Sequence, residues 1–97
     1  MTRLDDDEVR AALADGLPGW EAENGALIKE FTFPGFRAAI AFIDRVAGLA
    51  QAARHHPDLW NRYNRVHVTL STHDEGGITE KDVALARAIE SAADVEA

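Results

Sequence analysis

Histidine is concentrated in one short part of this 97-residue chain. The four histidines, His55, His56, His67 and His73, fall within nineteen positions. Histidine has the unperturbed pKa nearest to neutral pH, so it is the usual proton carrier in proteins and a common metal ligand. This grouping predicts a site for proton transfer, with metal binding as the first alternative.

Two predicted strands bring three of these histidines together. The residue pattern predicts a hairpin of two strands, 59–63 and 66–72, with its turn at Asn64-Arg65. His55 and His56 come just before the first strand, and His73 follows the second. Because the start of one strand and the end of its hairpin partner lie at the same edge, we expect the three imidazoles to lie near each other.

Other residues of this region have simpler explanations that stay open. Asp82 lies three residues after Thr79, so it could be only the distal member of a capping box, or it could return to the histidine edge. His67 lies on the polar face of its strand, and we expect it to be structural. Trp60 and Tyr63 would point to opposite faces; we expect one in the core, and the other could line a pocket for a flat ligand.

Metal binding and covalent catalysis have less support. His55, His56, His73 and Asp82 carry donor atoms that suit zinc. Adjacent histidines on an extended segment point in different directions, however, and the usual short His-x-His spacings are absent. No nucleophile-elbow sequence surrounds the nearby hydroxyl residues, and Gly76-Gly77 is too short to cradle a phosphate. We therefore expect no metal and no cofactor.

The rest of the chain predicts one α+β domain spanning residues 1–97. The expected elements are a helix 5–15, strands 20–23 and 26–33, a helix 36–54, strands 59–63 and 66–72, and a helix 79–93. Asp5 and Glu8 form a capping box for the first helix, and Asn24-Gly25 is a strong hairpin signal. Apolar and polar residues alternate in the last strand, which predicts a four-stranded antiparallel sheet with helices packed on one face.

The composition argues against several kinds of partner. Seventeen Asp and Glu residues against ten Lys and Arg give a formal charge of -7, which disfavours nucleic acid and anionic membranes. There is no cysteine and no apolar run long enough to span a membrane. The acidic N-terminus is unlike a signal peptide, so we expect a cytoplasmic protein. A chain this short buries a modest core, and self-association would help it.

Residues spread over most of the chain match one known pattern. They are Gln51 to Pro57 with its His-His-Pro, then Trp60, Asn61, Tyr63, Asn64, Val66 to His73, the glycine loop and Asp82. Gly19-Trp20, Phe33 to Phe42 and Thr79 to Ile89 extend the match. In these features the chain resembles the pterin-4a-carbinolamine dehydratases.

The resemblance implies a fold, an activity and an assembly. The fold is a four-stranded antiparallel sheet with helices on one side, and members form homodimers or homotetramers. The activity is dehydration of 4a-hydroxytetrahydrobiopterin to quinonoid dihydropterin, in tetrahydrobiopterin recycling. The active-site histidines map onto His55, His56 and His73, and the active-site aspartate maps onto Asp82. The residues expected to bind the substrate are Pro57, Trp60, Thr72 and Asp82.

This chain departs from the family pattern in two places. Gln51 stands where the family often has an acidic residue, so an assisting carboxylate is lost there. Leu59 stands where the family often has an aromatic residue, with Trp60 next to it. Because the three histidines remain, we still expect activity.

The reaction needs two proton movements. The hydroxyl at C4a must leave as water, so an acid must protonate it, and a base must take the proton from N5. We expect His55 and His73 to be the acid-base pair, His56 to bind the pterin and share the acid role, and Asp82 to orient a histidine. The alternative is a protein-interaction module, a dimerisation cofactor that keeps a vestigial pterin pocket, as the animal members of the family imply.

Overall fold

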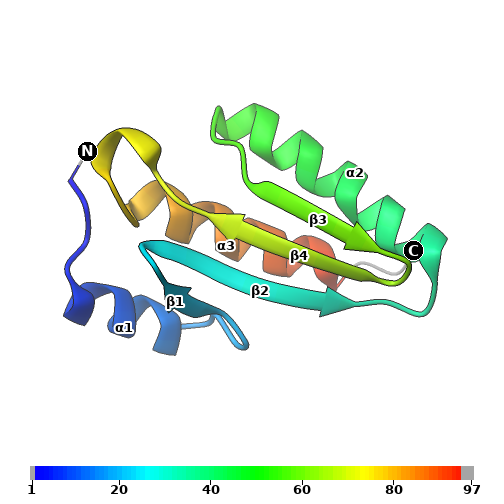
Figure 1. Ribbon diagram of the computed structural model, residues 1–97, viewed down its shortest axis with the longest axis horizontal. Coiled ribbons are helices and arrows are strands. Elements are labelled where there is room, and N and C mark those ends of the chain that lie inside the picture. Colours follow the sequence, from blue (N-terminus) through cyan, green and yellow to red (C-terminus); the bar gives the residue numbers. More distant parts are fainter. Residues whose placement is uncertain (1, 95–97) are drawn as a thin grey trace.

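The computed structural model describes residues 2–94, which form a four-stranded antiparallel sheet and three α-helices (Figure 1). The elements in chain order are α1 (Asp6–Ala14), β1 (Glu21–Glu23), β2 (Ala26–Thr32), α2 (Phe36–Ala53), β3 (Asp58–Arg62), β4 (Arg65–Leu70), a short 3₁₀ helix (His73–Glu75) and α3 (Glu80–Ala93). The strand order across the sheet is β1-β2-β4-β3. The predicted α+β class and element order are confirmed.

The core lies between the sheet and two of the helices. Helices α2 and α3 pack side by side on one face of the sheet, while α1 lies beside β1 at its edge (Figure 1). The large buried core residues of β4 and α2 include Val66, Val68, Leu70, Phe42 and Val46. In β4 these buried residues alternate with half-buried polar ones, as the sequence predicts. No helix within residues 2–94 is both long enough and apolar enough to cross a membrane.

The first helix and the first hairpin form as their local sequences predict. The carboxylate of Asp5 accepts from the backbone N–H of Glu8 at 2.8 Å, and Glu8 accepts from the backbone N–H of Asp5 at 2.9 Å, which closes the capping box. Asn24 and Gly25 have φ angles of 52° and 76°. Positive φ at both central residues is what a tight two-residue hairpin turn requires.

The second hairpin corrects a predicted turn by one residue. Arg62 pairs with Arg65, so the turn is Tyr63-Asn64 and not Asn64-Arg65. Tyr63 has a φ of 51°, which is uncommon for a residue with a side chain. The amide of Asn64 donates to the carbonyl of Phe33 at 2.9 Å, and the N–H of Phe33 donates to the carbonyl of Asn64 at 2.8 Å. These contacts with the neighbouring loop fix Asn64 inside the turn.

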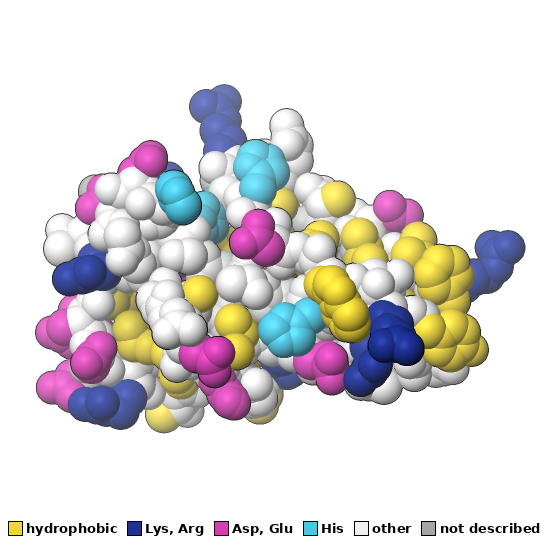
Figure 2. Space-filling view, viewed as in Figure 1, with side chains coloured by type: hydrophobic (Ala, Val, Ile, Leu, Met, Phe, Trp, Pro, Cys, Tyr) yellow, Lys and Arg dark blue, Asp and Glu magenta, His cyan; other side chains and the backbone are white. Residues whose placement is uncertain are grey.

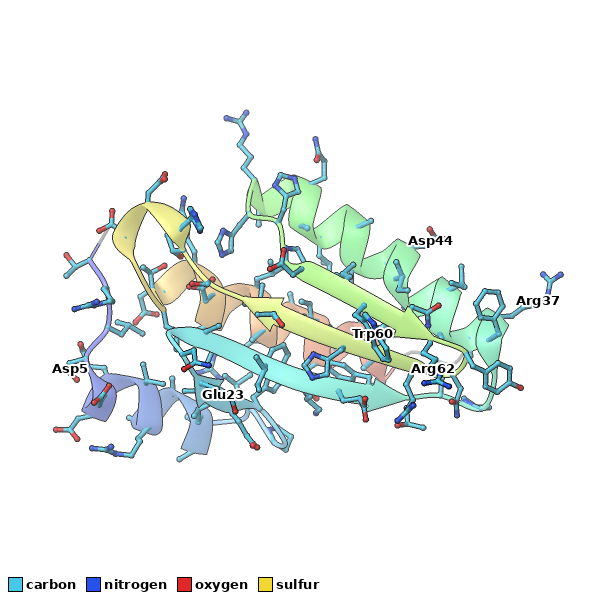
Figure 3. All side chains as sticks on the ribbon, viewed as in Figure 1. Asp5, Glu23, Arg37, Asp44, Trp60 and Arg62 are labelled. Carbon is cyan, nitrogen blue, oxygen red and sulfur yellow. The ribbon has the colours of Figure 1, made fainter. Side chains whose placement is uncertain are left out.

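The expectation that Trp60 or Tyr63 would enter the core is wrong. Trp60 is 51% exposed and Tyr63 is 65% exposed. The reason is that β3 is an edge strand, and Tyr63 belongs to the turn rather than to the strand. Trp60 projects from the sheet face opposite to the one that α2 and α3 cover (Figure 3).

Candidate functional site

His55 is held in place by the way α2 ends. Arg54 adopts the left-handed conformation, with φ 53° and ψ 39°, and stops the helix. The backbone N–H of His55 then donates to the carbonyl of Ala50 at 3.1 Å, the six-to-one contact of a Schellman motif. Pro57 disfavours the helical conformation only at His56, so the helix ends earlier than the proline alone requires. His55 therefore follows the helix on a backbone that is fixed by hydrogen bonds.

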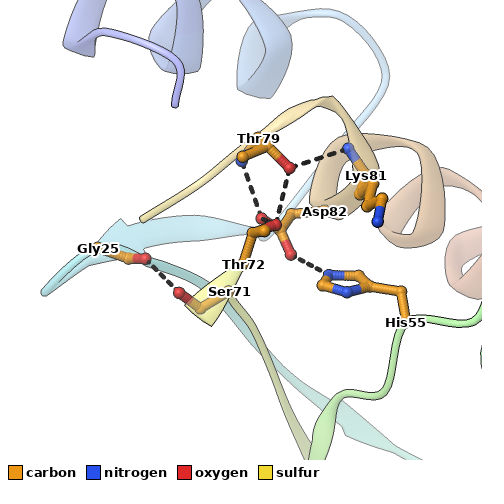
Figure 4. A network of polar contacts seen from close by, with 7 residues as sticks. All are labelled: Gly25, His55, Ser71, Thr72, Thr79, Lys81 and Asp82. Atoms are coloured by element: carbon orange, nitrogen blue, oxygen red, sulfur yellow. Dashed lines mark hydrogen bonds and ion pairs between the residues drawn. The ribbon is translucent and has the colours of Figure 1, made fainter. Parts of the chain in front are cut away.

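The imidazole of His55 pairs with the carboxylate of Asp82. Nε2 of His55 lies 2.5 Å from Oδ1 of Asp82 (Figure 4). The His55 side chain is 11% exposed, and Asp82 is fully buried. A carboxylate beside one imidazole nitrogen fixes the orientation of the ring and stabilises the positive charge that the ring acquires when it takes up a proton.

Asp82 also caps α3, so both explanations that the sequence left open hold together. Oδ2 of Asp82 accepts from the backbone N–H of Thr79 at 2.9 Å, and the hydroxyl of Thr79 accepts from the backbone N–H of Lys81 at 3.2 Å. Asp82 is the third residue of the helix and closes a capping box with Thr79. Oδ2 of the carboxylate thus caps the helix, and Oδ1 contacts His55.

Thr72 connects the end of β4 to the same carboxylate. Its hydroxyl donates to Oδ2 of Asp82 at 2.8 Å and lies 2.7 Å from the hydroxyl of Thr79 (Figure 4). The backbone N–H of Thr72 donates to the carbonyl of Gly77 at 2.9 Å, so the glycine loop folds back onto the strand. Thr72 and Asp82 are thus buried and bonded to protein groups, and both support His55 from within.

The other two histidines of the predicted cluster are exposed at the same edge. His73 follows Thr72 directly and begins the 3₁₀ helix, and His56 follows His55 directly. Nε2 of His56 lies 3.3 Å from Oε1 of Gln51, in the last turn of α2. Histidine side chains gather on the upper part of the face shown in Figure 2, over the region where β3 begins and β4 ends (Figure 1).

His67 and Trp60 lie apart from this edge, on the open face of the sheet. His67 pairs with Trp60 on one side and with Glu30 on the other. His67 is half-buried on the polar face of β4, where the sequence predicts it, and its structural role stays a prediction. Pro57 lies directly before β3, next to His56, and is half-buried.

The site also contains a residue that sequence reasoning treated only as a helix start. The hydroxyl of Thr79 is fully buried and contacts the hydroxyl of Thr72. The signal that could have found it is a capping box whose distal member is also a candidate site residue. Among residues 2–94, no three His, Asp or Glu side chains are grouped so that they could hold a metal ion.

Comparisons with known proteins find one family along nearly the whole chain. The family model described as pterin 4 alpha carbinolamine dehydratase matches residues 2–92. A protein of Thermomicrobium roseum with the provisional name pterin-4-alpha-carbinolamine dehydratase is 56% identical over 90% of this chain and 92% of its own length. A protein of Metallosphaera sedula with the same provisional name is 48% identical over 93% of each chain.

Two solved structures have the same fold. The transcriptional coactivator/pterin dehydratase from Brucella melitensis superposes with a TM-score of 0.91 at 39% identity, over 95% of this chain and 99% of that one. A pterin dehydratase-like protein identified as a RuBisCO assembly factor in the alpha-carboxysome gives a TM-score of 0.66 at 23% identity, over 79% and 89% of the two chains. With the family model matching nearly its whole length, the chain belongs to the pterin-4-alpha-carbinolamine dehydratase family.

Proposed function

We propose that this protein dehydrates 4a-hydroxytetrahydrobiopterin to quinonoid dihydropterin and water by histidine acid-base catalysis. The observation that carries the proposal is the pairing of His55 with buried Asp82 at 2.5 Å. Asp82 also accepts a hydrogen bond from Thr72, the residue directly before His73. An imidazole with a fixed carboxylate partner is suited to accepting a proton near neutral pH. This dehydration would be one step in tetrahydrobiopterin recycling.

The base in this mechanism is His55. As the C4a–O bond breaks, its electron pair leaves with the hydroxyl oxygen, and the lone pair of N5 forms the new C4a=N5 bond. The N5 proton then passes to the neutral imidazole of His55. Asp82 stabilises the resulting imidazolium, because the carboxylate is fixed and desolvated beside the ring.

The acid in this mechanism is His73, with His56 in support. The imidazolium of His73 gives its proton to the departing hydroxyl, which leaves as water. His56 binds the pterin and shares the acid role, and Gln51 holds its ring through the 3.3 Å contact without offering a titratable group. After each turnover, solvent protons restore the starting states of both rings. Pro57, which borders His56, remains a candidate for contact with the pterin, whereas Trp60 lies apart from the histidine edge and has no part in this mechanism.

The test is a dehydration assay on chemically generated 4a-hydroxytetrahydrobiopterin with single histidine variants. We expect His55→Ala and His73→Ala to lower kcat by about 10²–10⁴-fold, the range for one acid or base. His56→Ala should raise KM as well as lower kcat. His67→Ala is the matched control, because it removes an imidazole from the open sheet face, and it should keep kcat within about two-fold. Full activity in His55→Ala or His73→Ala would contradict the role given to that residue.

A second function is favoured by one surface. A groove of about 380 Å³ runs between α2 and α3, lined mainly by alanine and leucine, with His55 and Lys81 at one end. An apolar strip on paired helices suits a partner helix, and the Brucella melitensis relative is titled both coactivator and pterin dehydratase. The second candidate is therefore a protein-interaction module. A folded protein with no dehydratase activity and no pterin binding by calorimetry would favour this function over the first.

A further inference from the structure

We infer that Thr72 and Thr79 are positioning residues whose hydroxyls form a one-way hydrogen-bond chain into Asp82. Through Asp82 this chain fixes which nitrogen of His55 is free to exchange a proton with a ligand. The inference rests on the proposed function for its catalytic consequence, while its hydrogen-bond arrangement can be tested without any substrate.

The direction of the chain follows from counting hydrogens. An ionised carboxylate only accepts, and a hydroxyl has one hydrogen to donate. The Thr72 hydroxyl uses its hydrogen on Oδ2 of Asp82 at 2.8 Å. The 2.7 Å contact between the two hydroxyls must therefore be donated by Thr79 and accepted by Thr72. The Thr79 hydroxyl in turn accepts from the backbone N–H of Lys81. Each hydrogen in this series of hydrogen bonds therefore has a single acceptor.

Burial of the three side chains favours this one direction of the hydrogen bonds. Thr79 and Asp82 are fully buried and Thr72 is 9% exposed. A buried polar group without a partner costs far more free energy than an exposed one. If the Thr72 hydroxyl donated to Thr79 instead, Oδ2 of Asp82 would have one donor fewer. The carboxylate is thus held at Oδ2 by Thr72 and by the backbone of Thr79, and Oδ1 is left for His55.

The consequence reaches the ring of His55. Because Oδ1 accepts, Nε2 of His55 must carry its hydrogen toward Asp82. Nδ1, the other ring nitrogen drawn in Figure 4, has no hydrogen-bond partner within residues 2–94. Since no buried side-chain nitrogen or oxygen in this part of the chain lacks a partner, Nδ1 is open to solvent. Nδ1 is the nitrogen of His55 that takes the proton.

The first experiment reads the tautomer of His55 directly. Long-range ¹H–¹⁵N correlation spectra of the labelled full chain distinguish a protonated ring nitrogen from an unprotonated one. At a pH where His55 is neutral, we expect a protonated Nε2 and an unprotonated Nδ1. A spectrum with the hydrogen on Nδ1 would overturn the inference, because Asp82 would then be the donor.

The second experiment removes one hydroxyl while keeping the shape of the side chain. Thr72→Val should leave the His55 tautomer mixed and lower kcat about ten-fold with KM nearly unchanged, because a misoriented ring still permits binding. Thr72→Ser should restore both the tautomer and kcat. Thr69→Val, in β4 just before Thr72 and outside the hydrogen-bond network, is the matched control and should change neither.

The outcomes separate the two proposals. An unchanged tautomer and kcat in folded Thr72→Val would overturn the positioning role. If the wild-type protein has no dehydratase activity, the proposed function fails, while the tautomer spectra of the wild type and of Thr72→Val still decide the hydrogen-bond arrangement. Thr79→Ser, which keeps both the helix cap and the donor, should behave as the wild type; a loss of the Nε2–H tautomer there would contradict the chain.

Discussion

At the scale of single residues, the site depends on one carboxylate whose two oxygens have different hydrogen-bond partners. Asp82 uses Oδ2 to accept from Thr79 and Thr72, and Oδ1 to contact His55. Because the two oxygens are equivalent in chemistry but not in surroundings, a small change at this side chain affects the helix cap and the imidazole differently. This separation makes Asp82 the most informative position to alter.

Asp82→Asn should remove activity through the tautomer of His55. The new amide can keep its oxygen toward Thr79 and Thr72, but its NH₂ would then face Nε2 of His55 and donate to it. The ring must then carry its hydrogen on Nδ1, which leaves no lone pair there for the substrate. We expect kcat to fall by about 10²-fold or more in the dehydration assay.

The control for this substitution is Asp44→Asn, which changes an exposed carboxylate in α2. It should keep kcat close to that of the wild type, with both variants folded by circular dichroism. Dehydration at the wild-type rate in Asp82→Asn would show that the carboxylate charge has no part in the chemistry.

At the scale of elements, the site is assembled from the ends of secondary structures. The C-terminus of α2 supplies His55, the end of β4 supplies Thr72, and the first turn of α3 supplies Asp82. None of these residues lies in the middle of an element. The geometry of the site is therefore controlled by how each element stops or starts.

Arg54→Gly should make the end of α2 more stable. Arg54 holds a left-handed conformation, which costs a residue with a side chain about 1 kcal/mol and which glycine adopts without that cost. We expect the free energy of unfolding in urea to rise by about 0.5–1 kcal/mol. Arg62→Gly, in the extended backbone of β3, should lower it. A lower stability for Arg54→Gly would mean that the guanidinium side chain contributes more than the backbone conformation costs.

The elements could largely be predicted from the sequence because their signals are local. The turn at Asn24-Gly25 and the capping boxes at Asp5 and Thr79 each depend on residues three or fewer positions apart. The position of the second turn could not be predicted, because a tyrosine side chain gives no sign of the positive φ that Tyr63 adopts. Contacts with Phe33, in another loop, also determine the position of Asn64.

The site was predicted in outline and not in detail. The hairpin argument predicted His55, His56 and His73 at one edge, with Asp82 as a residue that could return to it from the last helix. In the structure Asp82 contacts His55 and also Thr72, which directly precedes His73. The assignment of catalytic and substrate-binding roles to these residues stays a prediction. The hydroxyl chain could not be predicted, because it depends on the glycine loop folding back so that Thr72 meets the start of α3. Such contacts between distant segments leave no period or spacing in the sequence.

At the scale of the whole molecule, the sheet has an unpaired edge beside the site. β3 is the last strand of the sheet, and exposed Leu59, Trp60 and Tyr63 lie on it or at its turn. An edge strand offers free backbone donors and acceptors to another chain, and a small core gains stability from association. These features support the proposal that the protein forms a homodimer or a homotetramer.

Sedimentation at micromolar concentration should therefore give the mass of a dimer or a tetramer. Because the chain carries a net charge of -7, self-repulsion should weaken when salt is raised, so the assembled fraction should not fall between about 0.05 and 0.5 M NaCl. A strict monomer at every salt concentration would contradict the expected assembly.

The sharing of Asp82 between a helix cap and an imidazole links catalytic competence to local opening of the chain. Helix ends fray far more readily than whole domains unfold. Whenever the first turn of α3 opens, the Thr79 cap and the His55 contact are lost in the same event, although the sheet stays intact. On warming, the population of competent sites should thus decline before the fold does, and hydrogen exchange at the amide of Thr79 should follow the loss of rate more closely than any signal from the core.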